Sequence, residues 1–425
     1  MPRQMKDSGV MWIGSIPVSW NTIKFKYLHD GMNTGEGIDK NYWTDEPTDK
    51  PFYTAGLNPI RTSYDSFPDW KYTKKNDLLL ARNGTPYVYL PVSNACYTDH
   101  IIRASMKKGS NRKYIQYSLQ RSIASVLVDS VSLATWSASL WNEQVIAWPS
   151  VEEQDRIVDY LDKQCAHIDL VLEQTRKSIA EYKKLKQFMI SQAVTQGVRD
   201  NRTLVESDVE WIGLIPVEWK KTQLRHCASV KSGITLGKTY SESTELFEQP
   251  YLRVANVQDG YVDISDLAVL SVSADEIEKY KLHKGDVLMT EGGDRDKLGR
   301  GCVWDARVDP CLHQNHIFAV KTNESLLNPY YLEYVTASKV GRDYFDVTAV
   351  KTTNLACTSS SKVLAFVIPL PSLEEQKEII EYLKQKVGEL DNLIAKKQHF
   401  IAELENYKKS MIYEYVTGKK EVPQS

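Results

Sequence analysis

The chain contains the same pair of motifs twice, and this duplication limits its architecture more than any other feature. The sequence Trp-Ile-Gly-x-Ile-Pro-x-x-Trp occupies residues 12–20 and recurs at residues 211–219. A second motif, Pro-Ser-x-Glu-Glu-Gln, occupies residues 149–154 and recurs at 371–376. Each half therefore consists of a variable segment followed by a constant one. The repeat is far longer than the few dozen residues of a solenoid unit, so it indicates a duplicated two-part module.

The constant segments have the pattern of long helices. Ser150 and Ser372 stand where a helix cap is favoured, and the acidic pairs that follow suit the positive end of a helix dipole. Apolar residues then recur at three- and four-residue steps, a spacing typical of a coiled-coil seam. The seam positions are Leu390, Leu393, Phe400, Leu404, Tyr407 and Met411 in the second half, and Ile168, Val171, Tyr182, Leu185 and Met189 in the first. An ordinary amphipathic core helix is the alternative.

Two such helices in a duplicated chain can pair in opposite directions about a pseudo-two-fold axis. The variable segments are rich in Tyr, Trp, Thr, Gly and Asn, with short apolar runs typical of strands at residues 77–80 and 286–289. The sequence therefore predicts a mixed α/β (α+β) fold, in which two globular domains are separated by two long antiparallel helices forming a coiled coil. The predicted segments are a first globular domain at 1–148, a central helix at 149–199, a second globular domain at 200–370 and a distal helix at 371–425.

Composition constrains the partners and the compartment. The formal net charge of −2 offers no overall excess for a nucleic acid, so any phosphate-binding surface must come from local clustering. Residues 103–121 contain six basic and no acidic side chains, although a solvated helix face commonly has this pattern. The six cysteines lie far apart, and neither a signal peptide nor an apolar run of membrane-spanning length is evident. We therefore expect a reduced, cytoplasmic protein.

Three motifs suggest chemistry but do not meet its requirements. The loop at residues 233–239 has three residues between its glycines, whereas a P-loop needs four. Asn328-Pro329 lacks the second proline of an adenine methyltransferase motif and more simply predicts a helix start. Cys302, Cys311, His313 and His316 do not have the spacing of a standard zinc finger, and we prefer polar or DNA-facing roles for the two histidines. We therefore expect no catalytic residue, no metal and no cofactor in this chain.

The order of motifs resembles the specificity subunits of type I restriction–modification enzymes, commonly called HsdS. The resemblance rests on the Trp-Ile-Gly-x-Ile-Pro-x-x-Trp start of each half and on the Pro-Ser-x-Glu-Glu-Gln segment that leads into each long helix. Gly285-Asp286-Val287-Leu288 before a Gly-rich loop and Val416-Thr417-Gly418 at the end of the second helix are also typical. The first half departs from this pattern, with Asn76-Asp77 and with Gln196 where the closing glycine is usual.

The resemblance implies that each variable domain is a target-recognition domain for one half of a bipartite double-stranded DNA site. The paired helices would set the spacing of the half-sites and dock the partner subunits. Two modification subunits would bring S-adenosylmethionine and methylate adenine, and restriction subunits would add ATP- and Mg²⁺-dependent translocation and cleavage. This chain would be a non-catalytic member of that complex.

Base contacts are expected from side chains that hydrogen-bond to base edges in the major groove, and from nearby phosphate-binding residues. The candidates in the first domain are Arg82, Asn83, Tyr87, His100 and Arg103. Those in the second are Lys231, Thr235, Lys238, Arg253, Asn256, Arg295, Lys297, Arg300, Gln314 and Lys351. Each has a surface or turn role as its alternative. At the level of function, a coiled-coil scaffold or regulator that binds only proteins and a self-sufficient methyltransferase or nuclease are the alternatives.

Overall fold

Two long helices are present where the capping signals predict them. The computed structural model describes residues 3–83, 86–127, 135–293, 298–299, 301–351 and 356–423. Helix α3 covers Val151–Gln196 and helix α8 covers Leu373–Val416. The hydroxyl oxygens of Ser150 and Ser372 each accept a hydrogen bond of 3.3 Å from a backbone N–H in the first turn. Among the residues described, no helix is both long and apolar enough to cross a membrane.

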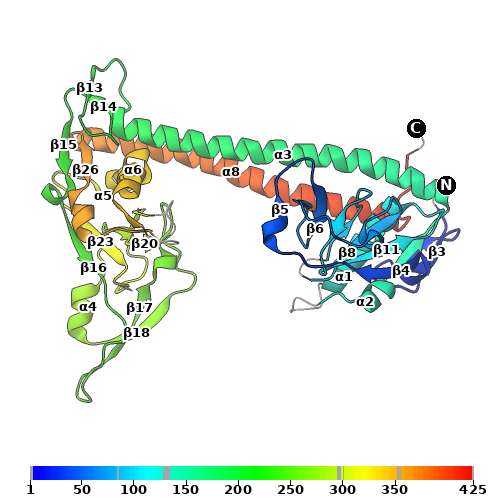
Figure 1. Ribbon diagram of the computed structural model, residues 1–425. Helices are drawn as coiled ribbons and strands as arrows, with labels where there is room; N and C mark the ends of the chain where they lie inside the picture. The colour runs from blue at the N-terminus through cyan, green and yellow to red at the C-terminus, as the bar shows by residue number, and fades with distance from the viewer. Residues whose placement is uncertain are drawn as a thin grey trace. The chain divides into compact units, whose positions relative to one another are not determined.

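The chain divides into two units that share these helices. Unit 1 comprises Met1–Thr175 and His399–Ser425, and unit 2 comprises Arg176–Gln398. Each unit thus contains one variable segment, the start of one long helix and the end of the other. The predicted mixed α/β fold, with two domains linked by long helices, is confirmed (Figure 1). The exact boundaries predicted for the four segments stay a prediction.

The long helices lie side by side and antiparallel within each unit. In unit 1, the Lys408 ammonium contacts both carboxylate oxygens of Asp169 at 2.6 and 2.7 Å. In unit 2, the Lys186 ammonium contacts both carboxylate oxygens of Asp391 at 2.8 Å. The later residue of α3 therefore pairs with the earlier residue of α8, as an antiparallel arrangement requires. Because all four side chains are substantially exposed, the apolar seam contributes more to stability than these ion pairs do.

The seam was predicted only in part. Leu390 and Met411 are buried as expected, being 8% and 3% exposed. The prediction is wrong for four residues that are 42%, 44%, 58% and 44% exposed, respectively Leu393, Phe400, Tyr407 and Leu185. The three on α8 recur at seven-residue steps and so share one face of the helix. A wide apolar stripe in one sequence does not reveal which of its edges meets the partner helix.

Unit 1 is built on a central antiparallel sheet of order β4-β11-β8-β9 (His29–Thr34, Ile101–Met106, Asp77–Ala81, Val88–Tyr89). A second sheet has the order β10-β6-β7-β5 (Cys96–Tyr97, Lys50–Tyr53, Ile60–Thr62, Trp43–Thr44). Two smaller sheets pair β1 (Met5–Asp7) with β2 (Ser15–Pro17) and β3 (Asn21–Lys24) with β12 (Val145–Trp148). Helices α1 (Arg112–Leu127) and α2 (Ala138–Asn142) pack with the central sheet around Leu80, Ile115 and Trp141.

Unit 2 repeats this plan with the central order β16-β23-β19-β21 (Ala228–Ser232, Ile317–Thr322, Val287–Thr290, Gly301–Val303). Two smaller sheets have three strands each, β18-β17-β22 (Ala268–Val272, Phe247–Leu252, Leu312–His313) and β20-β25-β24 (Gly292–Gly293, Ala356–Cys357, Val350–Lys351). The remaining pairs are β13 (Leu204–Glu206) with β14 (Leu214–Pro216) and β15 (Lys220–Gln223) with β26 (Val367–Leu370). The helices are α4 (Ala274–Tyr280), α5 (Pro329–Ala337), α6 (Lys339–Thr348) and α7 (Ser360–Ala365).

The repeated tryptophan and glutamate contact each other in both units. In unit 2, the Trp219 indole N–H donates to the Glu375 carboxylate at 3.0 Å, and Arg202 forms an ion pair with the same carboxylate. The Arg202 guanidinium also lies 5.8 Å from the centroid of the Trp219 ring. The equivalent residues of unit 1 are Trp20, Glu153 and Arg3. The two motifs therefore recur together because the last tryptophan of the first motif holds the first helical turn of the second motif.

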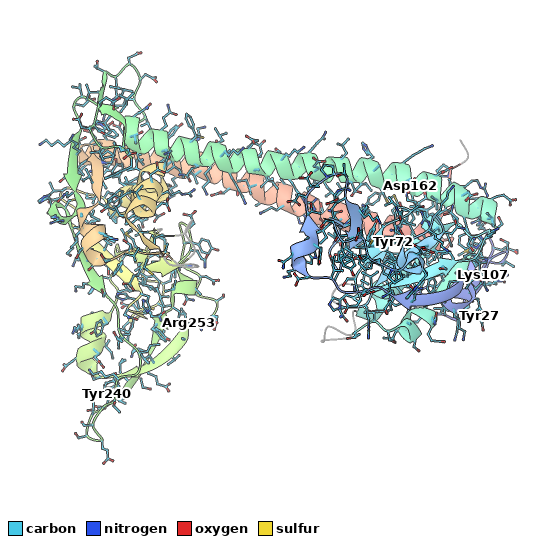
Figure 2. The ribbon with its side chains drawn as sticks, viewed as in Figure 1. Tyr27, Tyr72, Lys107, Asp162, Tyr240 and Arg253 are labelled. Atoms are coloured by element: carbon cyan, nitrogen blue, oxygen red, sulfur yellow. The ribbon has the colours of Figure 1, made fainter. Side chains whose placement is uncertain are left out.

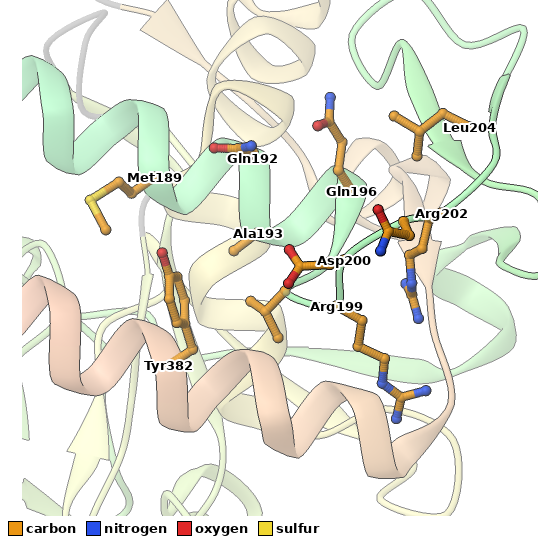
Figure 3. Close-up of a pocket in the computed structure, with 12 residues that line it drawn as sticks. Met189, Gln192, Ala193, Gln196, Arg199, Asp200, Arg202, Leu204 and Tyr382 are labelled. Atoms are coloured by element: carbon orange, nitrogen blue, oxygen red, sulfur yellow. The ribbon is translucent and has the colours of Figure 1, made fainter.

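A cavity of about 430 Å³ lies where α3 ends in unit 2 (Figure 3). Met189 and Gln192 line it from α3, and Tyr382 lines it from α8. Gly197 stops α3 with a left-handed φ of 78°, a conformation that glycine adopts without strain. Just beyond it, the Arg199 guanidinium makes two 2.7 Å hydrogen bonds to the Glu378 carboxylate on α8. The end of one long helix is thus tied to the beginning of the other.

A buried tyrosine joins each variable domain to the end of a long helix. The Tyr331 hydroxyl lies 3.2 Å from the carbonyl oxygens of both Val194 in α3 and Pro369 in β26. In unit 1 the Tyr114 hydroxyl lies 2.8 Å from the Ala147 carbonyl oxygen and 3.0 Å from that of Val416 in α8. Each unit therefore includes, in its core, the last turns of the long helix that started in the other half.

We expect Tyr331→Phe to destabilise unit 2 by about 1–3 kcal/mol, because two buried carbonyl groups lose their hydroxyl partner. The measurement is urea denaturation followed by a signal from unit 2. Tyr330→Phe is the matched control, since that neighbouring side chain is 46% exposed. Equal midpoints for the two variants would contradict the bridging role of Tyr331.

Two glycines, one inside α8 and one just after its end, should respond oppositely to alanine. Gly388 lies inside α8 with open space where a methyl group would stand, so Gly388→Ala should stabilise the chain by about 0.5–1 kcal/mol. Gly418 has a φ of 72°, and a Cβ there would lie 2.5 Å from Pro17 Cδ. Gly418→Ala should therefore lower the thermal midpoint. A rise in both midpoints would show that α8 does not end against Pro17.

Candidate nucleic-acid interface

Unit 1 brings three of the five predicted residues of its domain together at one corner of the central sheet. The corner, here the His100 corner, consists of Arg82 and Asn83 after β8 and His100 before β11. The Arg82 backbone N–H donates to the His100 carbonyl at 2.8 Å, and the Asn83 amide nitrogen lies 2.7 Å from His100 Nδ1. Arg82 and His100 are exposed. Tyr87, which precedes β9, is half-buried with its ring 6.1 Å from that of Tyr89.

Unit 2 has the same corner, formed by Glu291 after β19 and His316 before β23. This is the His316 corner. The Glu291 backbone N–H donates to the His316 carbonyl at 2.9 Å, and the Glu291 carboxylate lies 2.6 Å from His316 Nδ1. Lys231 near the end of β16 and Thr235 in the loop after it are both exposed. The chain segment with Thr235 is held at this corner, because the Asn315 backbone N–H donates to the Ile234 carbonyl at 3.0 Å.

Two predicted residues are turned into the protein. Arg103 is only 7% exposed, and its guanidinium donates to the Tyr72 carbonyl at 2.9 Å while lying 3.7 Å from the Asp77 carboxylate. Asn256 is 5% exposed, and its amide binds three backbone groups of its own loop. Both side chains are buried and bound to backbone groups of neighbouring loops, so the geometry does not support direct base contacts for them.

Three other candidates are partly engaged within unit 2. The Arg253 guanidinium, visible in Figure 2, donates to the Asp266 carboxylate at 2.7 Å. The Lys238 ammonium lies 2.6 Å from the Glu276 carboxylate, which also accepts from the Tyr240 hydroxyl at 2.7 Å. These hydrogen bonds hold the pKa of Glu276 at about 2, although burial acts in the opposite direction and is the largest single effect.

Gln314, the third of these candidates, immediately precedes Asn315 at the His316 corner. Its side-chain oxygen accepts a 3.4 Å hydrogen bond from the Val254 backbone N–H. The remaining predicted residues, Arg295, Lys297 and Arg300, lie outside the described residues, as does the side chain of Lys351. None of the predicted DNA contacts has been tested, so the exposed ones stay predictions.

Sequence reasoning did not single out His316 and Glu291 as members of a shared corner. A signal was present, because Asp99-His100-Ile101 corresponds to Asn315-His316-Ile317. In both segments the histidine immediately precedes an inner strand of the unit's main sheet, β11 or β23. The match consists of two identical residues after a similar one, and it is obvious only once the two sheets are aligned.

The other motifs behave as ordinary structural elements. Helix α5 begins at Pro329, and the Asn328 side chain accepts from the Tyr330 backbone N–H at 3.0 Å, which confirms the predicted helix start. His313 is 1% exposed, and burial lowers its pKa to about 4. Within the described part of the chain, no group of three or more metal-ligating side chains is present.

A second repeated surface lies between each variable domain and the end of a long helix. In unit 1 a cavity of about 460 Å³ is lined by α1 and α8, with Gln116, Arg121 and Lys408 among its residues. In unit 2 a cavity of about 700 Å³ is lined chiefly by α5, α3 and α8, with Glu333 and Lys186 among its residues. The two cavities occupy corresponding places. Gln116 lies two residues after Tyr114 on α1, and Glu333 lies two residues after Tyr331 on α5. The hydroxyls of these two tyrosines each contact a carbonyl oxygen at the end of a long helix.

Comparisons with known proteins agree with the resemblance. A model of the type I restriction modification DNA specificity domain matches residues 216–406. The type I restriction enzyme EcoBI specificity subunit of Escherichia coli is 22% identical over 73% of this chain and 66% of that relative. The MjaVIII specificity subunit of Methanocaldococcus jannaschii is 28% identical over 64% of this chain and 61% of that relative. With two further curated specificity subunits, the matches span 47% to 66% of the relative's length.

The fold is shared with a solved chain from structural work on complex assembly and conformational transition of the type I R-M system. The TM-score is 0.69 at 16% identity, over 95% of this chain and 99% of the other. These findings confirm the resemblance that the repeated motifs indicated.

The stability of unit 2 should depend on pH through Glu333. Burial raises the pKa of this carboxyl group to about 7, and the nearby Asp259 carboxylate acts in the same direction, while the Val303 backbone N–H opposes it. The pKa of a glutamate in the unfolded chain is about 4.3. The contribution of this group to the free energy of unfolding is therefore fully present below about pH 4.3 and is lost as the pH rises through about 7. We expect Glu333→Gln to reduce the loss of stability between about pH 5 and pH 8, by on the order of 2 kcal/mol.

The measurement is urea denaturation across this range, with the exposed Glu324→Gln as control. An E333Q variant whose stability falls with pH as steeply as that of the unaltered chain would contradict the assignment.

Proposed function

We propose that this chain, a relative of the specificity subunits of type I restriction–modification enzymes, is the DNA sequence-specificity subunit of such a complex. The recognition domains at 1–148 and 200–370 would each read one half of a bipartite double-stranded site. The observation that carries the proposal is the duplication of the exposed corner. Both units present side chains with hydrogen-bonding capacity at the same end of the same sheet. A reader of two half-sites needs this repetition.

The proposed partners are two modification subunits, which would carry S-adenosylmethionine, and restriction subunits, which would use ATP and Mg²⁺. The exposed apolar residues on one face of α8, Leu393, Phe400 and Tyr407, support a protein partner along this helix. Apolar side chains spaced by seven residues suit contacts with another helix. The chain itself is proposed to be non-catalytic. Its proposed location is the cytoplasm, because it would act on cellular DNA.

The proposal is tested by sequencing methylated bases in a strain with and without the gene. We expect one bipartite adenine motif to disappear when the gene is removed, because the modification subunits would lose their target recognition. A strain that produces the chain without residues 20–148 is the control for the first half-site, and it should also lack the motif. If the methylation pattern is the same in all three strains, the proposed function is wrong.

A purified sample gives an independent check. The chain together with its modification subunits should prefer DNA containing the motif over scrambled DNA, by about 10³-fold or more at a stated salt concentration. Equal affinity for both DNAs would favour a role in protein binding only.

A further inference from the structure

His100 and His316 occupy equivalent positions in the two units. Each carbonyl accepts the backbone N–H of the residue that follows the neighbouring strand, Arg82 in unit 1 and Glu291 in unit 2. A glycine also packs against the turn before each histidine. A Cβ on Gly35 would lie 1.9 Å from the Tyr97 carbonyl oxygen, and the corresponding distance in unit 2, from Gly233 to the His313 carbonyl oxygen, would be 2.0 Å. The backbone of the two corners is therefore the same.

The partners of the two imidazole rings differ. Nδ1 of His100 faces the amide nitrogen of Asn83 at 2.7 Å, whereas Nδ1 of His316 faces a carboxylate oxygen of Glu291 at 2.6 Å. Both histidines are exposed, and the His316 side chain is 56% exposed. Within the described residues, neither Nε2 atom has a hydrogen-bond partner of its own. Nε2 is thus the atom that each corner presents to a ligand.

The partner of Nδ1 determines what Nε2 can do. A neutral imidazole has one donor nitrogen and one acceptor nitrogen. The amide NH₂ group of Asn83 can only donate, so Nδ1 of His100 accepts and the proton lies on Nε2. The carboxylate of Glu291 can only accept, so in the neutral ring Nδ1 of His316 carries the proton and Nε2 has a free lone pair.

From this geometry we infer that His100 and His316 contact bases in the two half-sites and are held in opposite tautomers by Asn83 and Glu291. His100 offers a donor to a base acceptor such as guanine O6 or N7. His316 offers an acceptor to a base amino group such as adenine N6 or cytosine N4. The inference rests on the proposed function and adds to it the residue pairs that give the two half-sites different sequences.

The tautomers can be measured without DNA. Long-range ¹H–¹⁵N correlation spectra of the full chain, labelled at histidine and recorded at about pH 8.5, distinguish the two tautomers and the doubly protonated ring. His100→Gln and His316→Gln assign the signals. We expect the proton of His100 on Nε2 and that of His316 on Nδ1. The same tautomer at both positions, or a doubly protonated His316, overturns the inference.

A reciprocal exchange of the partners tests base contact. Glu291→Gln gives His316 a neighbour that can donate, and Asn83→Asp gives His100 a neighbour that can only accept. In the assembled methyltransferase, we expect each variant to change the preferred base at one position of a single half-site, by about tenfold, and to leave the other half-site unchanged. Methylation of a library with randomised half-sites measures this. Surface variants Glu242→Gln and Asn94→Asp are the matched controls, since both positions are exposed and lie outside the two corners.

The outcomes separate the inference from the proposed function. If the unaltered chain directs no bipartite methylation, the proposed function fails. If it does so, but both exchanges leave the two half-site preferences as they were, only the inference fails. If an exchange abolishes methylation, the tautomers measured in the unaltered chain test the inference instead: opposite tautomers support it, and equal tautomers overturn it. A change confined to the expected half-site in each variant supports the inference.

Discussion

The hydrogen bond from an indole N–H to a glutamate in the first helical turn is the contact on which the rest of each unit depends. In unit 2 the Glu375 side chain is only 4% exposed, so its charge needs partners, and Trp219 and Arg202 provide them. Gly197, which follows the last residue of α3, lies directly beside this group: a Cβ there would lie 2.8 Å from Arg202 Nη1 and 2.9 Å from Glu375 Oε1. One cluster therefore fixes the start of α8, the end of α3 and the entry to the variable domain.

Features that depend on neighbours in sequence were predictable. The serine caps mark the helix starts at Val151 and Leu373, and the apolar runs at 77–80 and 286–289 correspond to β8 and β19. Features that depend on tertiary contacts were not. The exposed stripe through Phe400 and the pairing of Arg3 with Glu153 follow from how segments far apart in sequence meet, which one amphipathic pattern does not specify.

The candidate site likewise contains residues that local sequence could indicate and residues whose positions depend on tertiary contacts. Residue type drew attention to Asn83 and His100, and the structure places both at the same end of the central sheet. It could not distinguish them from Arg103, whose guanidinium lies beside the buried Asp77 carboxylate. The sequence favoured a polar or DNA-facing role for His316 but did not place it among the candidate DNA contacts, because its equivalence to His100 becomes visible through strand register and not through local composition.

The tyrosine bridges also determine how the chain would behave if its backbone were cut. Residues 199–201 between α3 and β13 are exposed. A break there would produce two fragments, yet the Tyr331 hydroxyl in one would still need the Val194 carbonyl in the other, and the Tyr114 hydroxyl would need that of Val416 in return. Neither fragment holds a complete core, so the two would stay associated after proteolysis and would have to find each other in order to fold. The folded state therefore requires that each fragment complete the core of the other, and it does not require an unbroken backbone at residues 199–201.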